Sequence, residues 1–233
     1  MTQYRPTVSD EYAATIRRWQ DSIYQSEKAR VTQQVEFLGR TFTLPPKVHP
    51  INATSDLLGN AVLNEVREGD RVLDLGTGSG VNAILAASKS TNVLAVDINP
   101  LAVRCAKQNA RANNVEQRIS FSESDVFQNV SGTFDLIIFD PPFRWFAPRD
   151  DYELATTDEN YKSLTTFFLS VGNFLTEGGR ILFFFGSSAD LGYVNQLIEK
   201  SGLKKQVVAS RDLEKDGLPV SYFTLKLSAS AGA

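Results

Sequence analysis

The chain has 233 residues, of which 42% are hydrophobic and 22% are charged, and its formal net charge is −3. This composition supports one hydrophobic core of good size, and the charge excludes the global basic field that would gather long duplex DNA. The single cysteine excludes a disulfide framework, and no apolar run reaches the ~20 residues that span a bilayer. The first residues also lack the apolar core of a signal peptide, so we expect a cytoplasmic protein without membrane contact.

The N-terminal part of the chain predicts a helix followed by a hairpin. Residues 9–33 carry apolar side chains at helical spacing, on one face. These side chains are Tyr12, Ile16, Trp19 and Ile23. In residues 35–44, apolar side chains alternate along the chain on both sides of a turn at Gly39-Arg40, which is typical of a hairpin. We expect residues 1–50 to form a cap that docks its apolar face near the mouth of a site on the following domain.

The rest of the chain, residues 51–227, predicts one α/β domain, followed by a disordered tail at residues 228–233. A helix begins near Thr54 or Ser55, and from residue 71 strands alternate with helices, as in a doubly wound parallel sheet. Strands are predicted at 71–75, 92–97, 118–122, 134–139, 180–185, 204–209 and 220–227. Helices are predicted at 81–89, 99–113, 158–175 and 189–200.

The most informative segment is residues 71–80, where an apolar strand runs into a glycine-rich turn. Glycines at positions 76, 78 and 80 let the backbone turn tightly and approach a ligand closely, and the next helix presents free N–H groups there. Such a loop alone also fits a dinucleotide site or a plain turn. Asp74 beside it would repel a pyrophosphate and suits a ligand that carries an ammonium or sulfonium charge.

Two motifs together resemble a known family. Residues 74–80 resemble the first motif of the class I S-adenosylmethionine-dependent methyltransferases, and residues 140–143, Asp-Pro-Pro-Phe, resemble the fourth motif of those members that methylate nitrogen. The resemblance covers roughly residues 50 to 227. It implies a Rossmann-like, seven-stranded sheet whose last strand inserts antiparallel beside the fifth, with S-adenosylmethionine as the cofactor and no metal.

The resemblance also implies a cofactor site at the carboxyl ends of the strands. Its residues would be Asp74, Gly76, Thr77, Gly78, Gly80, Asp97, Ile98, Asp125 and Val126. Asp97 would accept both ribose hydroxyls, with a helix cap as the alternative role. Ile98 would lie against the adenine, and Asp125 with Val126 would hold its amino group and ring, unless Asp125 is an ordinary loop residue. Asp74 would act near the methionine amino end, directly or through water.

Asp140, Pro141, Pro142 and Phe143 would carry the chemistry. An amide or exocyclic amino nitrogen is a poor nucleophile because its lone pair is delocalised. The Asp140 carboxylate and the Pro141 carbonyl would accept its two N–H groups and free that lone pair. The prolines would fix the direction of the carbonyl, and Phe143 would stack on a planar target. The alternative is a rigid Pro-Pro turn without chemistry.

Arg144, Trp145 and Phe146 follow the motif and are expected to bind the substrate. Trp145 and Phe146 would be exposed and stack on a base or a planar small molecule, and Arg144 would be available for a phosphate or carboxylate. Alternatively, this segment is a lid packed on the N-terminal helix. Related families methylate glutamine in release factors, with Asn at position 140, or guanine in ribosomal RNA. The acceptor is therefore RNA, protein or a planar small molecule, and a non-catalytic cofactor-fold subunit is the alternative function. The oligomeric state and any role of His49 stay open.

Overall fold

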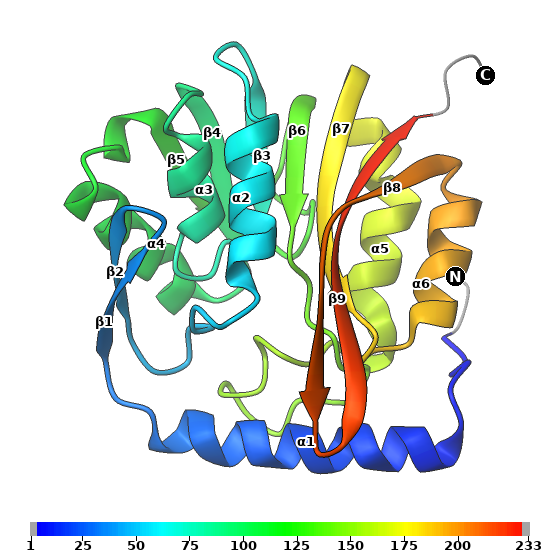
Figure 1. Cartoon of the computed structure of the whole chain (residues 1–233). Coiled ribbons are helices and arrows are strands. Elements are labelled where there is room, and N and C mark those ends of the chain that lie inside the picture. The colour runs from blue at the N-terminus through cyan, green and yellow to red at the C-terminus, as the bar shows by residue number, and fades with distance from the viewer. Residues whose placement is uncertain (1–3, 230–233) are drawn as a thin grey trace.

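The computed structural model describes residues 4–229, which form a seven-stranded sheet between two layers of helices (Figure 1). The sheet order is β5-β4-β3-β6-β7-β9-β8. Strands β3 to β7 are parallel, and β9 runs antiparallel to both β7 and β8. The strands are β3 (Arg71–Leu75), β4 (Asn92–Asp97), β5 (Ile119–Glu123), β6 (Phe134–Phe139), β7 (Leu175–Gly186), β8 (Leu203–Lys215) and β9 (Leu218–Ala229). The predicted doubly wound sheet with an antiparallel last strand is confirmed.

The helices differ from prediction mainly at their ends. They are α1 (Asp10–Ala29), α2 (Ser55–Glu65), α3 (Val81–Ala86), α4 (Pro100–Ala112), α5 (Lys162–Ser170) and α6 (Leu191–Lys200). The helix predicted at 158–175 is interrupted, since Asn160 and Tyr161 have φ angles of 54° and 48°, which a right-handed helix does not allow. Single-turn 3₁₀ segments at Glu116–Arg118, Glu159–Tyr161 and Val171–Phe174 complete the set.

Strand boundaries also differ from prediction. β8 and β9 form a longer hairpin than predicted, and β9 includes Ser228 and Ala229, which the sequence placed in the tail. The rest of that tail, residues 230–233, lies outside the described residues. The N-terminal hairpin, β1 (Gln33–Phe37) and β2 (Arg40–Leu44), turns at Leu38 and Gly39 rather than at Gly39-Arg40. Both turn residues have positive φ angles, as a tight two-residue hairpin turn requires.

Two hydrophobic cores lie on opposite faces of the sheet. One joins the sheet to α5, α6 and residues of α1, and the other joins it to α2, α3, α4 and the N-terminal hairpin. The hairpin is held on α4 by the Asn109 side chain, whose Oδ1 accepts from the Thr43 amide at 2.8 Å. No helix among residues 4–229 is both long and apolar enough to cross a membrane.

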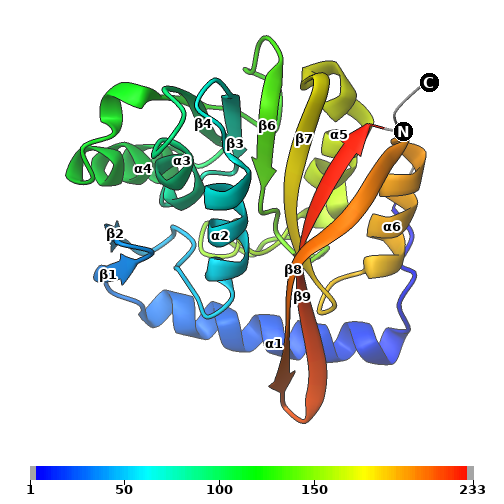
Figure 2. The same ribbon diagram turned by 45° about the horizontal axis from the view of Figure 1, so that its top comes forward.

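Helix α1 crosses the molecule at the end of the sheet where the parallel strands finish (Figures 1 and 2). Ser9 caps it by accepting from the Tyr12 amide, and its buried face includes Ile16 and Trp19. The tip of the β8–β9 hairpin reaches α1, where the Lys215 ammonium lies 4.9 Å from the centre of the Trp19 ring. The N-terminal segment is therefore built into the domain rather than appended to it.

Candidate active site

A cleft of about 1010 Å³ opens at the carboxyl ends of the parallel strands. Its walls come from the glycine loop after β3, the ends of β4 and β6, and residues 47–55, which join β2 to α2. Gln20 and Ile23 add one wall from α1. Ligands of doubly wound folds bind at this edge, and the volume suffices for a nucleoside-sized cofactor and a second reactant.

The glycine loop has the conformation that its sequence predicts. Gly76 and Gly78 have φ angles of 65° and 56°, which disfavour residues with a side chain, and both line the cleft. Gly80 has a φ angle of 85° and serves packing instead, because a Cβ there would lie 2.9 Å from the Cα of Ala106 in α4. The loop backbone is thereby open to a ligand on one side and pressed against α4 on the other.

Asp74 lies beneath this loop rather than on the cleft surface. It is buried, and its Oδ2 accepts from the Thr77 hydroxyl at 2.6 Å and from the Ala83 amide in the first turn of α3 at 3.1 Å. Burial raises the pKa of Asp74 to about 7. Asp74 holds the loop to α3, and its expected action near the methionine amino end, directly or through water, stays a prediction.

Asp97 and Ile98 meet the cleft at the end of β4. The Asp97 carboxylate accepts from the amides of Gly78 and Asn99 at 2.9 and 2.8 Å, while burial raises its pKa. Asn99, not Asp97, caps α4 by accepting from the Leu101 amide. Ile98 is 60% exposed, which is unusual for an apolar residue beside a core strand and suits a flat apolar ligand.

Asp125 and Val126 follow β5 and also line the cleft. Val126 has a φ angle of 47°, a conformation that β-branched residues rarely adopt. The Ser124 hydroxyl fixes it by donating to the Val126 carbonyl at 2.9 Å. Backbone strain of this kind gathers at ligand sites, where the surrounding structure maintains it.

Asp140 directly follows β6, with its side chain open to the cleft. Within residues 4–229, no donor is in hydrogen-bond contact with its carboxylate. The side chain is exposed to the cleft, but the protein atoms gathered around it reduce its solvation, and this desolvation, together with the nearby Asp74 carboxylate, raises the pKa of Asp140 to about 7. A carboxylate without hydrogen bonds to the protein is free to accept from a ligand N–H group.

The residues after Asp140 form a rigid turn along the same wall. Pro141, Pro142 and Phe143 all line the cleft. The Phe143 ring lies 4.9 Å from the Phe185 ring, and the Tyr161 hydroxyl donates to the Phe143 carbonyl at 2.8 Å. The ring is held in place, with part of its surface left exposed to the cleft.

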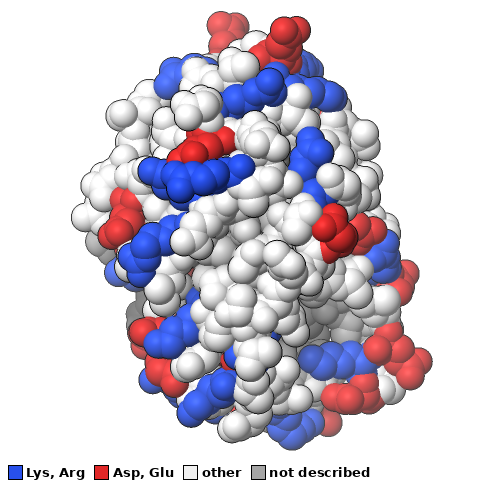
Figure 3. Space-filling model, turned by 90° about the vertical axis from the view of Figure 1, so that its left-hand side faces the viewer, with Lys and Arg blue, Asp and Glu red and all other residues white. Residues whose placement is uncertain are grey.

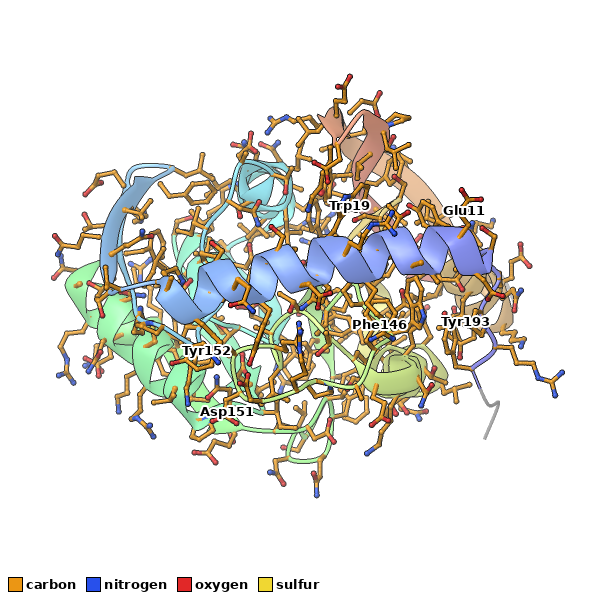
Figure 4. The ribbon with its side chains drawn as sticks, turned by 90° about the horizontal axis from the view of Figure 1, so that it is seen from below. Glu11, Trp19, Phe146, Asp151, Tyr152 and Tyr193 are labelled. Atoms are coloured by element: carbon orange, nitrogen blue, oxygen red, sulfur yellow. The ribbon has the colours of Figure 1, made fainter. Side chains whose placement is uncertain are left out.

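The expectation that Trp145 and Phe146 are exposed is wrong. They are 7% and 6% exposed, and neither lines the cleft. The Trp145 ring lies 6.4 Å from that of Tyr4, and the Arg17 guanidinium covers Phe146 at 4.0 Å from its ring centre, beside α1 (Figure 4). The lid alternative is therefore the correct one, because aromatic surface beside α1 is better buried than left in water.

Several cleft residues were not predicted. Lys47, His49 and Thr54 reach the cleft from the proline-rich segment before α2, and Tyr222 reaches it from β9. Burial lowers the pKa of His49, which favours a neutral imidazole. The prolines marked an extended segment, but only the packing of the N-terminal hairpin on α4 shows where that segment passes.

Charges around the site do not form a single basic face. On the side shown in Figure 3, acidic and basic side chains are interspersed. Acidic residues also line the cleft itself, among them Asp97, Asp125, Asp140 and Asp158. The part of the chain that the structure describes has no cluster of three or more His, Cys, Asp or Glu side chains arranged to hold a metal ion.

Two proteins of similar sequence are named as glutamine methyltransferases. A Methanocaldococcus jannaschii protein, provisionally assigned as a protein N5-glutamine methyltransferase, is 38% identical over 156 residues, 62% of this chain and 75% of the relative. The release factor glutamine methyltransferase of Rhodospirillum rubrum is 45% identical over 103 residues, which is 43% of this chain and 30% of that enzyme.

A solved structure shares the fold. The crystal structure of the M. jannaschii tRNA m1G37 methyltransferase superposes with a TM-score of 0.66 at 20% identity, over 88% of this chain and 58% of that one. Residues 49–212 match the model of the methyltransferase small domain, and this match covers the glycine loop, Asp97 and the Asp140 turn. The family implies S-adenosylmethionine as the cofactor, and the open glycine loop, Asp97 and the exposed Ile98 fit its nucleoside end. The chain therefore belongs to the methyltransferase small domain family.

Proposed function

We propose that the chain transfers the methyl group of S-adenosylmethionine to a planar nitrogen, an amide or exocyclic amino nitrogen of a protein or RNA acceptor. The observation that carries the proposal is the Asp140 carboxylate, which directly follows β6 in the cleft and has no hydrogen-bond donor among the described residues. Two relatives whose names state glutamine methylation support the amide alternative.

The catalytic step follows from the acceptor's electronic structure. The cofactor supplies an electrophilic methyl group on a sulfonium sulfur. The Asp140 carboxylate and the Pro141 carbonyl accept the two N–H groups of the target, which lets the nitrogen become pyramidal and direct its lone pair at the methyl carbon. The nitrogen–carbon bond would form as the sulfur–methyl bond breaks, with its electron pair leaving on the sulfur of S-adenosylhomocysteine. The nitrogen would gain positive charge, and one of its protons would pass to the Asp140 carboxylate. Phe143 provides a flat surface for the planar group.

We expect the cofactor site to depend on Asp97. The substitution Asp97→Ala removes two charged hydrogen bonds to the ribose, so cofactor binding weakens by roughly 1–3 kcal/mol. Calorimetry with S-adenosylhomocysteine measures the loss, and Glu177→Ala, an exposed carboxylate at the opposite end of the sheet, is the matched control. Equal affinity in the wild-type protein and the Asp97 variant would remove Asp97 from the site.

The pH dependence of methyl transfer tests the proposed function. Because the ionised form of Asp140 is the hydrogen-bond acceptor and its pKa is about 7, the single-turnover rate should rise with pH through about 7 and level off above it. In Asp140→Asn this rise should vanish, since an amide does not titrate. Asp74 has a similar pKa, so a rise that persists in Asp140→Asn would assign the titration to Asp74 and contradict the proposal.

A further inference from the structure

The Arg144 guanidinium is a buried cation that no carboxylate of the described residues neutralises. Arg144 is 5% exposed, it lines the cleft, and burial lowers its pKa. The ionisable groups that act on it are Tyr12, Tyr161, Tyr222 and Lys215. None of these side chains supplies a negative charge near neutral pH. A buried ion without a counter-ion is costly, so this position favours an anion from outside the chain.

Two nitrogen atoms of the Arg144 guanidinium have no acceptor among residues 4–229. Nη1 donates to the carbonyl and the hydroxyl of Ser188. Nε is buried without an acceptor and has no surface open to a ligand, whereas Nη2 also lacks an acceptor but is not closed off in this way. Nη2–H is therefore the group through which the guanidinium can make a charge-assisted hydrogen bond to an anion.

The backbone of Arg144 is fixed in the wall of the cleft. Its amide donates to the Thr156 carbonyl at 3.2 Å, and its carbonyl accepts from the Asp158 amide at 2.7 Å. Gln20 from α1 donates to the Thr156 hydroxyl at 2.9 Å, and its own Oε1 is a second buried polar atom without a partner. This part of the wall therefore holds both an N–H donor and an oxygen acceptor without a partner among residues 4–229.

A carboxylate fits this position better than an RNA phosphate. The cleft that Arg144 lines is otherwise acidic, with Asp125, Asp140 and Asp158 on its surface, and these carboxylates would repel a chain of phosphates. The guanidinium offers a single charge and one reachable nitrogen, Nη2, which suits a single carboxylate better than a chain of phosphates.

We propose that Arg144 binds a carboxylate of the methyl acceptor, so that the acceptor carries this group together with its planar nitrogen. The assignment of the ligand as the acceptor rests on the proposed function, whereas the anion site itself does not. Within the proposed function the carboxylate belongs to a peptide acceptor rather than to RNA, and a small acid is the alternative source that the experiment distinguishes.

Binding of matched probes to the full chain tests the site. We would titrate the chain, saturated with S-adenosylhomocysteine, with benzoate and with benzamide at fixed ionic strength in a calorimeter. Benzoate binding should weaken at least tenfold in Arg144→Gln and less in Arg144→Lys, while benzamide binding should not depend on Arg144. Arg104→Gln removes the same charge from an exposed position on α4 and should leave benzoate binding unchanged.

The outcomes separate the anion site from the proposed function. Equal benzoate binding in wild-type and Arg144→Gln, no benzoate binding in the wild-type chain, or tighter binding of inorganic phosphate would each overturn the proposal. Circular dichroism verifies that Arg144→Gln is folded. If that variant does not fold, the benzoate affinity of Arg144→Lys is compared with that of the wild type instead. If S-adenosylhomocysteine does not bind, the proposed function fails, and benzoate titration of the free chain still tests Arg144. Acetyl-alanyl-alanine and its amide then distinguish a peptide carboxylate from a small acid.

Discussion

Asp140→Ala should lower the rate of methyl transfer by about two to three orders of magnitude, the usual cost of deleting one preorganised hydrogen-bonding group at a reacting centre. The carboxylate has no hydrogen-bond donor among residues 4–229 and stands at the end of β6 beside the cleft, so its removal leaves the target nitrogen without its acceptor. Cofactor affinity should change little, since the glycine loop and Asp97 stay in place.

Single-turnover rates with saturating cofactor measure this effect. Asp140→Asn keeps an acceptor oxygen, so it should retain part of the activity, and the expected order is wild type, then Asn, then Ala. Binding of S-adenosylhomocysteine provides the control for a folded site. If the alanine variant transfers methyl groups as fast as the wild type, the Asp140 turn is only structural.

The second large effect concerns the attachment of α1. Trp19 is 4% exposed and packs into the core shared by α5, α6 and the sheet, with Lys215 of the β8–β9 hairpin over its ring. Trp19→Ala should lower the free energy of unfolding by about 3–5 kcal/mol, because it removes a large buried ring and leaves a cavity. Urea denaturation followed by circular dichroism measures the loss.

Glu11→Ala provides the matched control for this prediction, since Glu11 is an exposed residue of the same helix (Figure 4). It should change the free energy of unfolding by no more than about 0.5 kcal/mol. Equal stability of the two variants would mean that α1 is only loosely attached, and its place along the cleft through Gln20 and Ile23 would then lose its support.

Local sequence patterns predicted the fold and much of the cofactor side of the cleft. Three of these patterns depend only on neighbouring residues in the chain. They are the glycines before α3, the acidic residue at the end of β4 and the Pro-Pro turn after β6. Parallel strands bring their carboxyl ends to one edge of the sheet, so Asp97, Asp125 and Asp140 meet there without further information.

The errors concern long-range contacts. Trp145 and Phe146 were expected to be exposed because they follow a catalytic motif, but Tyr4 and Arg17, more than 100 residues earlier, pack against them. The same long-range contacts place Gln20 in the cleft wall. Periodicity describes the apolar face of a helix but not which loop it covers.

Transfer of label from methyl-labelled S-adenosylmethionine tests the central claim most directly. Wild-type protein and Asp140→Ala would each be incubated with the labelled cofactor and cell extract separated into protein, RNA and small-molecule fractions, and the labelled product would be analysed chemically. The account predicts label on an amide or amino nitrogen with the wild-type protein and at most about a hundredth of it with the alanine variant. No transfer by the wild-type protein, equal transfer by both, or label on carbon or oxygen would contradict it.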